Sequence, residues 1–224
     1  MKDVSQTLME HYARSFQEHG CSPQGVDWGP KLGDHALRLD RMLAVLLPGG
    51  NDGRRPSLLD VGCGYGALLD QMKARDIDLE YMGIDVCKEM VGAARQRHPA
   101  ATWQVADVLA LPDTPAFDYV VCNGILTQKL DVSIKDMDRF AQNAIRKMFR
   151  LCRRGIAFNV MSTHVNFMTD RLYYRNPVEL LAWCMSELSH HARLDHAYPL
   201  YEYTIYLFRR AAIFGESDGT SDAA

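Results

Sequence analysis

Three glycines and a series of aspartates have the spacing expected of a small-molecule binding site. Gly62, Gly64 and Gly66 directly follow a short apolar run, residues 58–61, that is typical of a buried parallel strand. Helical spacing begins at Ala67. Glycine reaches backbone conformations that are closed to other residues, and it lets a ligand lie against bare main chain. The segment therefore predicts a strand, a tight turn that contacts a small, elongated ligand, and a helix.

Acidic residues at the ends of the predicted strands indicate which ligand this is. Asp60 precedes the turn, where its carboxylate can hold the turn or an ammonium group. Asp85 ends a second strand (81–84), where a carboxylate can accept hydrogen bonds from both hydroxyls of a ribose. A third strand (101–106) leads to Asp107, which is placed to meet an adenine edge. The three acids fit a nucleoside that carries a positively charged amino-acid tail. The Gly-x-Gly-x-Gly spacing also differs from the Gly-x-Gly-x-x-Gly pattern that suits a dinucleotide.

These motifs closely resemble those of the class I S-adenosylmethionine-dependent methyltransferases, and the resemblance extends from the N-terminal helices to Arg210. Residues 60–66 match the first motif of the family, residues 83–85 the second and residues 105–108 the third, while residues 117–124 look like its fourth strand. The resemblance implies that Asp60 and the glycine turn hold the methionine part of the cofactor, that Asp85 holds the ribose, and that Asp107 holds the adenine amino group. The cofactor-binding residues expected on this basis are Asp60, Gly62, Cys63, Gly64, Gly66, Asp85, Val86, Asp107, Val108, Asn123, Tyr12, Trp28 and Arg38. One departure is Cys87, since many members have a small polar residue at that position.

The predicted fold class is α/β, with a Rossmann-like, mostly parallel sheet of seven strands and helices on both faces. Apolar strands alternate with helices from residue 58 onward, which is typical of parallel strands joined by right-handed crossovers. Residues 192–198 and 202–209 alternate like a hairpin, so the final strand is expected to be antiparallel. Residues 1–50 are expected to form an N-terminal helical lid and residues 51–214 the core of the same single domain. Residues 215–224 are expected to be a disordered tail.

Helical spacing in residues 4–19 and 35–47 predicts the two helices of the lid. In the family such helices often cover the cofactor. Tyr12 and Trp28 are therefore candidates for an aromatic face near the sulfonium, with simple packing as the alternative. Arg38 is a candidate for the cofactor carboxylate, because guanidinium geometry matches a carboxylate. Its alternative is an exposed arginine of the helix.

The composition is that of an ordinary globular protein, with 224 residues, 47% hydrophobic, and a net charge of −3. This charge gives no general attraction to nucleic acid or to an anionic membrane. The six cysteines contain no Cys-x-x-Cys pair, so reduced thiols are expected, and the histidines lack the spacing of a metal site. No long apolar run or signal peptide is found, so we expect a cytoplasmic protein.

The acceptor of the methyl group is expected just beyond the fourth and fifth strands. His164 follows the fifth strand and is the candidate catalytic base, because imidazole can titrate near neutrality. Its alternative is a surface residue. Asn123 can orient an acceptor or simply form a turn. Residues 165–176 make a long polar and aromatic loop that we interpret as a substrate cover. Tyrosines that can line the acceptor pocket, or belong to the sheet instead, are Tyr173, Tyr174, Tyr201 and Tyr203.

The function predicted from the sequence is S-adenosylmethionine-dependent methyl transfer to oxygen or nitrogen of a small metabolite, sugar or natural-product intermediate. The missing basic stripe argues against a nucleic-acid partner. Two alternatives stay open. One is a protein of the same fold that binds the cofactor or regulates a partner without catalysis. The other is an NAD-dependent oxidoreductase, which the glycine spacing and Asp60 disfavour.

Overall fold

The computed structural model describes residues 4–46 and 54–211. The helix predicted over residues 35–47 runs instead over Leu32–Leu43, so it begins and ends earlier than expected. The predicted tail, residues 215–224, lies outside the described residues. Among the residues described, no helix has both the length and the apolar composition needed to cross a membrane. The helices are α1 (Val4–His19), α2 (Leu32–Leu43), α3 (Ala67–Ala74), α4 (Lys88–Arg97), α5 (Ile134–Leu151) and α6 (Pro177–Glu187), with short 3-10 turns at Gln24–Val26 and Val108–Ala110.

The predicted sheet is confirmed, and the described residues contribute eight strands to it. The strands are β1 (Ser57–Val61), β2 (Glu80–Asp85), β3 (Thr102–Val105), β4 (Phe117–Cys122), β5 (Cys152–Ser162), β6 (Tyr174–Arg175), β7 (Ala192–Asp195) and β8 (Glu202–Phe208). Their order is β3-β2-β1-β4-β5-β8-β7, with the two-residue β6 pairing with β5. The strands β1 to β5 pair in parallel, and β8 runs antiparallel to both β5 and β7. The antiparallel final strand is therefore also confirmed, whereas β6 was not predicted.

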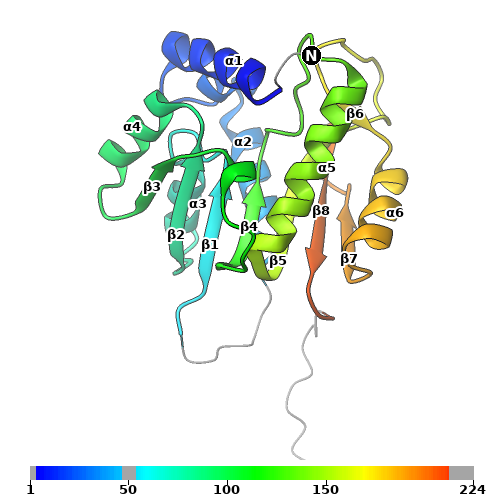
Figure 1. Ribbon diagram of the computed structural model, residues 1–224. Coiled ribbons are helices and arrows are strands. Elements are labelled where there is room, and N and C mark those ends of the chain that lie inside the picture. The colour runs from blue at the N-terminus through cyan, green and yellow to red at the C-terminus, as the bar shows by residue number, and fades with distance from the viewer. Residues whose placement is uncertain (1–3, 47–53, 212–224) are drawn as a thin grey trace, which may run out of the picture.

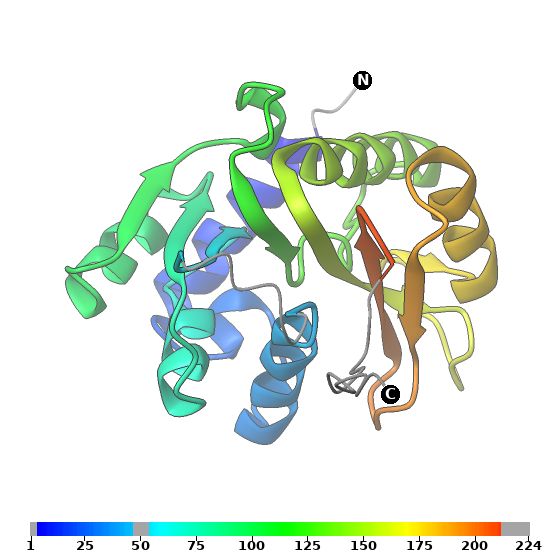
Figure 2. The ribbon, with the colours of Figure 1, turned by 90° about the horizontal axis from the view of Figure 1, so that it is seen from below.

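Helices cover both faces of the sheet (Figures 1 and 2). In β1, Leu59 and Val61 pack into the core on the side of α5, whereas Leu58 packs into the core on the side of α2, α3 and α4. This division follows from the geometry of a strand, in which successive side chains point to opposite faces. Asp60 shares the face of Leu58, which carries the carboxylate toward the second core.

The N-terminal helix α1 lies across the end of the sheet to which the arrows of β1 and β4 point (Figure 1). It ends at His19 as predicted, because Gly20 takes a positive φ of 60° and its N–H donates to the Phe16 carbonyl at 2.7 Å. Val4 and Leu8 bury the inner side of this helix against the core of α5. The carboxyl edge of the parallel strands is thus covered by α1.

Side-chain caps set the beginnings of two later helices. Ser133 Oγ accepts a hydrogen bond from the Asp136 N–H at 3.1 Å, so α5 begins at Ile134. Asn176 caps α6 by accepting from the Val178 N–H at 2.9 Å. This helix begins at Pro177, because the fixed φ of proline suits the first position of a helix.

Candidate active site

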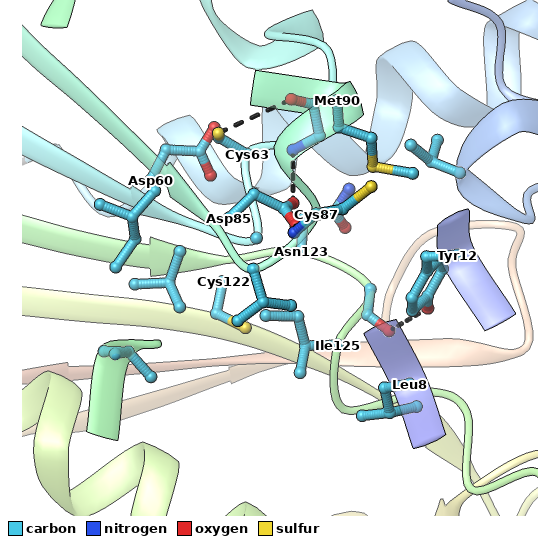
Figure 3. Close-up of a pocket in the computed structure, with 18 of the residues that line it drawn as sticks. Leu8, Tyr12, Asp60, Cys63, Asp85, Cys87, Met90, Cys122, Asn123 and Ile125 are labelled. Atoms are coloured by element: carbon cyan, nitrogen blue, oxygen red, sulfur yellow. Dashed lines mark hydrogen bonds between the residues drawn. The ribbon is translucent and has the colours of Figure 1, made fainter. Parts of the chain in front are cut away.

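A cavity with about 1100 Å³ of empty space, part of it open to solvent, lies at the carboxyl ends of the parallel strands (Figure 3). The main lining residues come from the strand ends and the segments that follow them, from α1, α2 and α5, and from the segment before α2. They are Leu8, Tyr12, Trp28, His35, Leu39, Asp60, Gly62, Cys63, Gly64, Asp85, Val86, Asp107, Val108, Asn123, Ile125 and Phe140.

The turn after β1 presents bare backbone to this cavity. Gly62 and Gly64 have positive φ angles of 73° and 53°, which disfavour any residue with a Cβ. A Cβ on Gly62 would also lie 2.5 Å from Ile125 Cδ1. The N–H groups of Gly62 and Cys63 both donate to the carbonyl of Ile84, at 2.8 and 3.0 Å, which fixes the turn to β2. Backbone of this kind can approach a ligand closely.

Gly66 has a different role from the other two glycines. Its φ is 89°, and a Cβ there would lie 2.7 Å from the ring of Trp103. It directly precedes α3 and is not part of the cavity lining. Gly66 therefore allows the helix to pack closely on β3.

The Asp85 carboxylate is held in place by two backbone donors. Its Oδ2 accepts from the Gly64 N–H at 2.9 Å, and its Oδ1 accepts from the Cys87 N–H at 2.8 Å. Burial raises the pKa of Asp85, and these backbone hydrogen bonds oppose that effect. Each carboxylate oxygen has a further lone pair, so a pair of ligand hydroxyls can still be bound.

Asp60 is buried at the end of β1, where it is 3% exposed. The hydroxyl of Tyr81 donates to its Oδ2 at 2.7 Å, and no described residue donates to its Oδ1. Burial raises the pKa of Asp60 to about 7, with a smaller contribution from the nearby charge of Asp85, while the Tyr81 hydrogen bond lowers it. The cavity therefore has a carboxylate that a cationic ligand group would stabilise in its charged form.

Asp107 connects the end of β3 to the N-terminal helix. Its Oδ1 accepts from the Leu109 N–H at 2.9 Å, and Ser5 Oγ donates to its Oδ2 at 3.1 Å. The carboxylate is half-buried and lines the cavity with Val108. The acids at the ends of β1, β2 and β3 thus line one cavity, as their spacing in the sequence indicated.

The turn after β4 is held in place by hydrogen bonds from several elements. The Gly124 N–H donates to Asn159 Oδ1 at 2.9 Å, and the Gly124 carbonyl accepts from the hydroxyls of Tyr12 at 3.2 Å and Thr127 at 2.6 Å. Gly124 has a φ of 98°, and a Cβ there would lie 3.2 Å from the Trp28 ring. Tyr12 and Trp28 of the predicted lid therefore both reach this turn, and both line the cavity.

Two predicted site residues lie outside the lining, as Gly66 does. Arg38 stacks over the Trp28 ring at 3.9 Å, and its Nε donates to Glu202 Oε2 at 2.9 Å, so it is neither exposed nor directed into the cavity. His164 is exposed, and its ring lies 6.2 Å from that of His196. The geometry thus gives the predicted base no contact with the cavity.

The predicted acceptor tyrosines also lie outside the lining. The hydroxyl of Tyr173 donates to Asp138 Oδ1 at 2.6 Å, and Tyr203 is fully buried in β8. Tyr174 belongs to β6, and Tyr201 is exposed. The loop around them is anchored to the segment after β4, since the Tyr173 N–H donates to the Thr127 carbonyl at 2.8 Å.

His35 of α2 lines the cavity and was not selected from the sequence. It is 7% exposed, and burial lowers its pKa to about 4, with a smaller contribution from the positive charge of Arg38. The signal was present in the sequence, because His35 precedes Leu39 and Met42 by four and seven residues, which places it on their buried helix face. A histidine on an apolar helix face was not enough to distinguish a core residue from a site residue.

Comparison with known proteins identifies the family. A family model described as a methyltransferase domain matches residues 58–155. A Mycobacterium tuberculosis protein named as a methyltransferase is 37% identical over 158 residues, which cover 70% of this chain and 94% of that protein. The chain belongs to the class I S-adenosylmethionine-dependent methyltransferases. A ubiquinone biosynthesis O-methyltransferase of Alkalilimnicola ehrlichii is 39% identical over 106 residues, 45% of this methyltransferase and 40% of that relative.

Solved structures show the same fold for this methyltransferase. Magnesium protoporphyrin IX methyltransferase from Synechocystis PCC 6803, with bound S-adenosylmethionine, has a TM-score of 0.64 at 14% identity, covering 94% of this chain and 99% of that one. The same enzyme with S-adenosylhomocysteine gives a TM-score of 0.64. The cofactor of this methyltransferase is S-adenosylmethionine.

The residues present fit this cofactor. The cavity combines bare backbone at the glycine turn with separate carboxylates that suit an ammonium group and a ribose. Asn123 Oδ1 is buried without a hydrogen-bond partner among the described residues, so a ligand N–H or O–H would satisfy it. The chemistry of these donors and acceptors matches a nucleoside with a cationic tail.

Proposed function

We propose that this methyltransferase transfers a methyl group to an oxygen or nitrogen atom of a small metabolite, sugar or natural-product intermediate. The main supporting observation is that the lining combines the three acids with apolar side chains that include Leu8, Ile125 and Phe140. Because α1 covers this edge of the sheet, the acceptor site favours a small molecule over an extended polymer (Figure 1). The relative named as a ubiquinone biosynthesis O-methyltransferase supports an oxygen acceptor.

In this proposal the cofactor-binding residues are those expected from the sequence that line the cavity. Asp60 and the Gly62–Gly64 turn hold the methionine part, Asp85 holds the ribose, and Asp107 holds the adenine. When bound, S-adenosylmethionine supplies an electrophilic methyl group on a sulfonium sulfur. The contribution of the chain is to align the acceptor with that group and to exclude water. Tyr12 and Trp28 contribute by joining the lid to the turn after β4.

The Asp85→Asn variant should bind S-adenosylhomocysteine about 1–3 kcal/mol more weakly than the wild type, because two ribose hydroxyls lose a charged acceptor. Isothermal titration calorimetry measures this difference directly. The matched control is Asp118→Asn. Asp118 is also buried at a strand end and accepts from the Ser57 N–H at 2.9 Å, but it lies outside the cavity lining. This control should lose stability and keep its cofactor affinity. Equal affinities of Asp85→Asn and the wild type would contradict the ribose assignment.

The proposed reaction is tested by a product search. The wild-type protein and the Asp85→Asn variant are incubated with methyl-labelled S-adenosylmethionine and a whole-cell extract of the source organism, and the small-molecule, protein and RNA fractions are then separated. The wild type should produce at least one labelled product below the size of a macromolecule, and the variant should produce less of it. Labelling of protein or RNA alone would overturn the proposal. Cofactor binding without any labelled product would instead favour a regulatory protein of the same fold.

A further inference from the structure

The charged side chains that line the cavity are all carboxylates. Its lining contains the carboxylates Asp60, Asp85 and Asp107, and none of its lining residues is Lys or Arg. A carboxylate or phosphate that leaves water without a counter-charge loses a large hydration free energy. An anionic acceptor would therefore enter this cavity without a positively charged lining side chain to replace its hydration.

Arg38, the guanidinium beside the lining residues Trp28 and His35, is already neutralised. It stacks on Trp28 at 3.9 Å and lies 2.9 Å from a carboxylate oxygen of Glu202, which is only 1% exposed. Asn159 Nδ2 also donates to Glu202 Oε1, at 3.2 Å. Moving Arg38 to an anionic acceptor would leave the Glu202 charge buried without its partner, which is strongly unfavourable.

His35 offers one uncharged polar contact in the lining. It lies in the lining with Trp28 and Leu39, and no described residue makes a hydrogen bond to its ring nitrogens. Burial keeps the pKa of this imidazole low, so the ring is neutral at physiological pH, with one N–H donor and one nitrogen acceptor. These ring nitrogens are therefore available to a ligand bound in the cavity.

Most of the uncharged lining residues are apolar. Leu8, Ile125 and Phe140 line the cavity, and Leu39 lies one helical turn after His35. On the basis of the proposed function, we propose that the acceptor is an uncharged, mainly apolar molecule whose hydroxyl or amine hydrogen-bonds to His35. His35 is thereby a specificity-determining residue of this methyltransferase.

The first experiment measures the effect of charge on binding. Protein saturated with S-adenosylhomocysteine is titrated with matched probe pairs that differ in one group: para-cresol and para-hydroxybenzoate, methylcatechol and dihydroxybenzoate, and hexanol and hydroxyhexanoate. The uncharged members should bind at least about tenfold more tightly than the carboxylates. Tighter or equal binding of the carboxylates, or no binding of any uncharged probe, would overturn the inference.

The second experiment tests His35 itself. His35→Phe keeps an aromatic ring and removes both hydrogen-bonding nitrogens, whereas His35→Gln keeps a donor and an acceptor. The Phe variant should bind the tightest uncharged probe about tenfold more weakly, and the Gln variant should recover part of this loss. Affinity for S-adenosylhomocysteine and the thermal midpoint should stay near wild type in the Gln variant. Loss of cofactor affinity with unchanged probe affinity would assign His35 to the cofactor and overturn the proposal.

These measurements separate this inference from the proposed function. The binding preference is read with S-adenosylhomocysteine, which has no methyl group to transfer. A protein that binds the uncharged probes through His35 but forms no labelled small-molecule product supports the inference and contradicts the proposed reaction. A protein that methylates a carboxylate compound from the extract, and binds it more tightly than its uncharged analogue, supports the proposed reaction and contradicts the inference.

Discussion

Replacing Glu202 with Ala should lower the free energy of unfolding by about 3–5 kcal/mol, because it leaves the Arg38 guanidinium buried without its carboxylate. Glu202 is 1% exposed, and Arg38 has only 12% of its side chain exposed. Burial raises the pKa of Glu202, and the Arg38 charge opposes this effect. The substitution also removes the acceptor of the Asn159 amide at 3.2 Å. Urea denaturation at pH 7 measures the difference.

Two further variants separate the ion pair from general packing. The double variant Arg38→Met with Glu202→Leu should recover most of the lost stability, because apolar groups of similar volume can replace a buried pair. Glu187→Ala breaks the exposed pair with Arg146, whose atoms lie 3.1 Å apart, and should cost less than about 1 kcal/mol. A Glu202→Ala protein as stable as the Glu187→Ala control would show that the buried pair does not anchor α2 to the sheet.

The network around this pair connects the lid with the turn after β4. Arg38 belongs to α2, Glu202 to β8 and Asn159 to β5, and Asn159 Oδ1 in turn accepts from the Gly124 N–H. Tyr12 of α1 donates to the carbonyl of the same glycine. The position of the turn after β4 therefore depends on residues from four separate elements.

The sequence was sufficient to predict the sheet and the convergence of its acids. The apolar run before Gly62 specified a buried strand, and the strand–helix alternation specified parallel pairing. Parallel strands place their carboxyl ends at one edge, so Asp60, Asp85 and Asp107 had to lie near each other. These inferences rest on local periodicity and chain direction, both of which can be read directly from the amino-acid sequence.

Side-chain partners that are distant in the chain could not be predicted in the same way. Arg38 and Glu202 meet only because α2 packs near the β5–β8 pair, which depends on the whole core. His164 follows a strand end as expected, but the direction of its side chain depends on the loop that follows. The strand β6 is two residues long, which is too short for an alternating pattern to indicate it.

The Asp60 carboxyl should contribute a loss of stability as the pH rises from about 4 to 7. The folded protein holds this carboxyl with a pKa of about 7, against an ordinary value of 3.8, so the folded state binds more protons in this window. The contribution is fully present below the lower value and is lost as the pH passes the upper one. The full shift corresponds to a loss of at most about 4 kcal/mol.

Asp60→Asn should therefore be more stable than the wild type at pH 8, by up to about 4 kcal/mol, and the difference should shrink toward pH 4. The amide retains an oxygen for the Tyr81 hydroxyl, which donates to Asp60 in the wild type at 2.7 Å. The same substitution removes the negative charge proposed to hold the cofactor ammonium, so affinity for S-adenosylhomocysteine should decrease. Urea denaturation across this pH range measures the first effect and calorimetry the second.

Asp78→Asn, at a carboxylate with 80% of its side chain exposed, is the control and should leave both the stability curve and the binding curve unchanged. Parallel stability curves for Asp60→Asn and the wild type would show that burial of Asp60 does not raise its pKa. A gain in stability together with a loss of affinity would instead show that this buried carboxylate is retained for binding at the expense of the folded state.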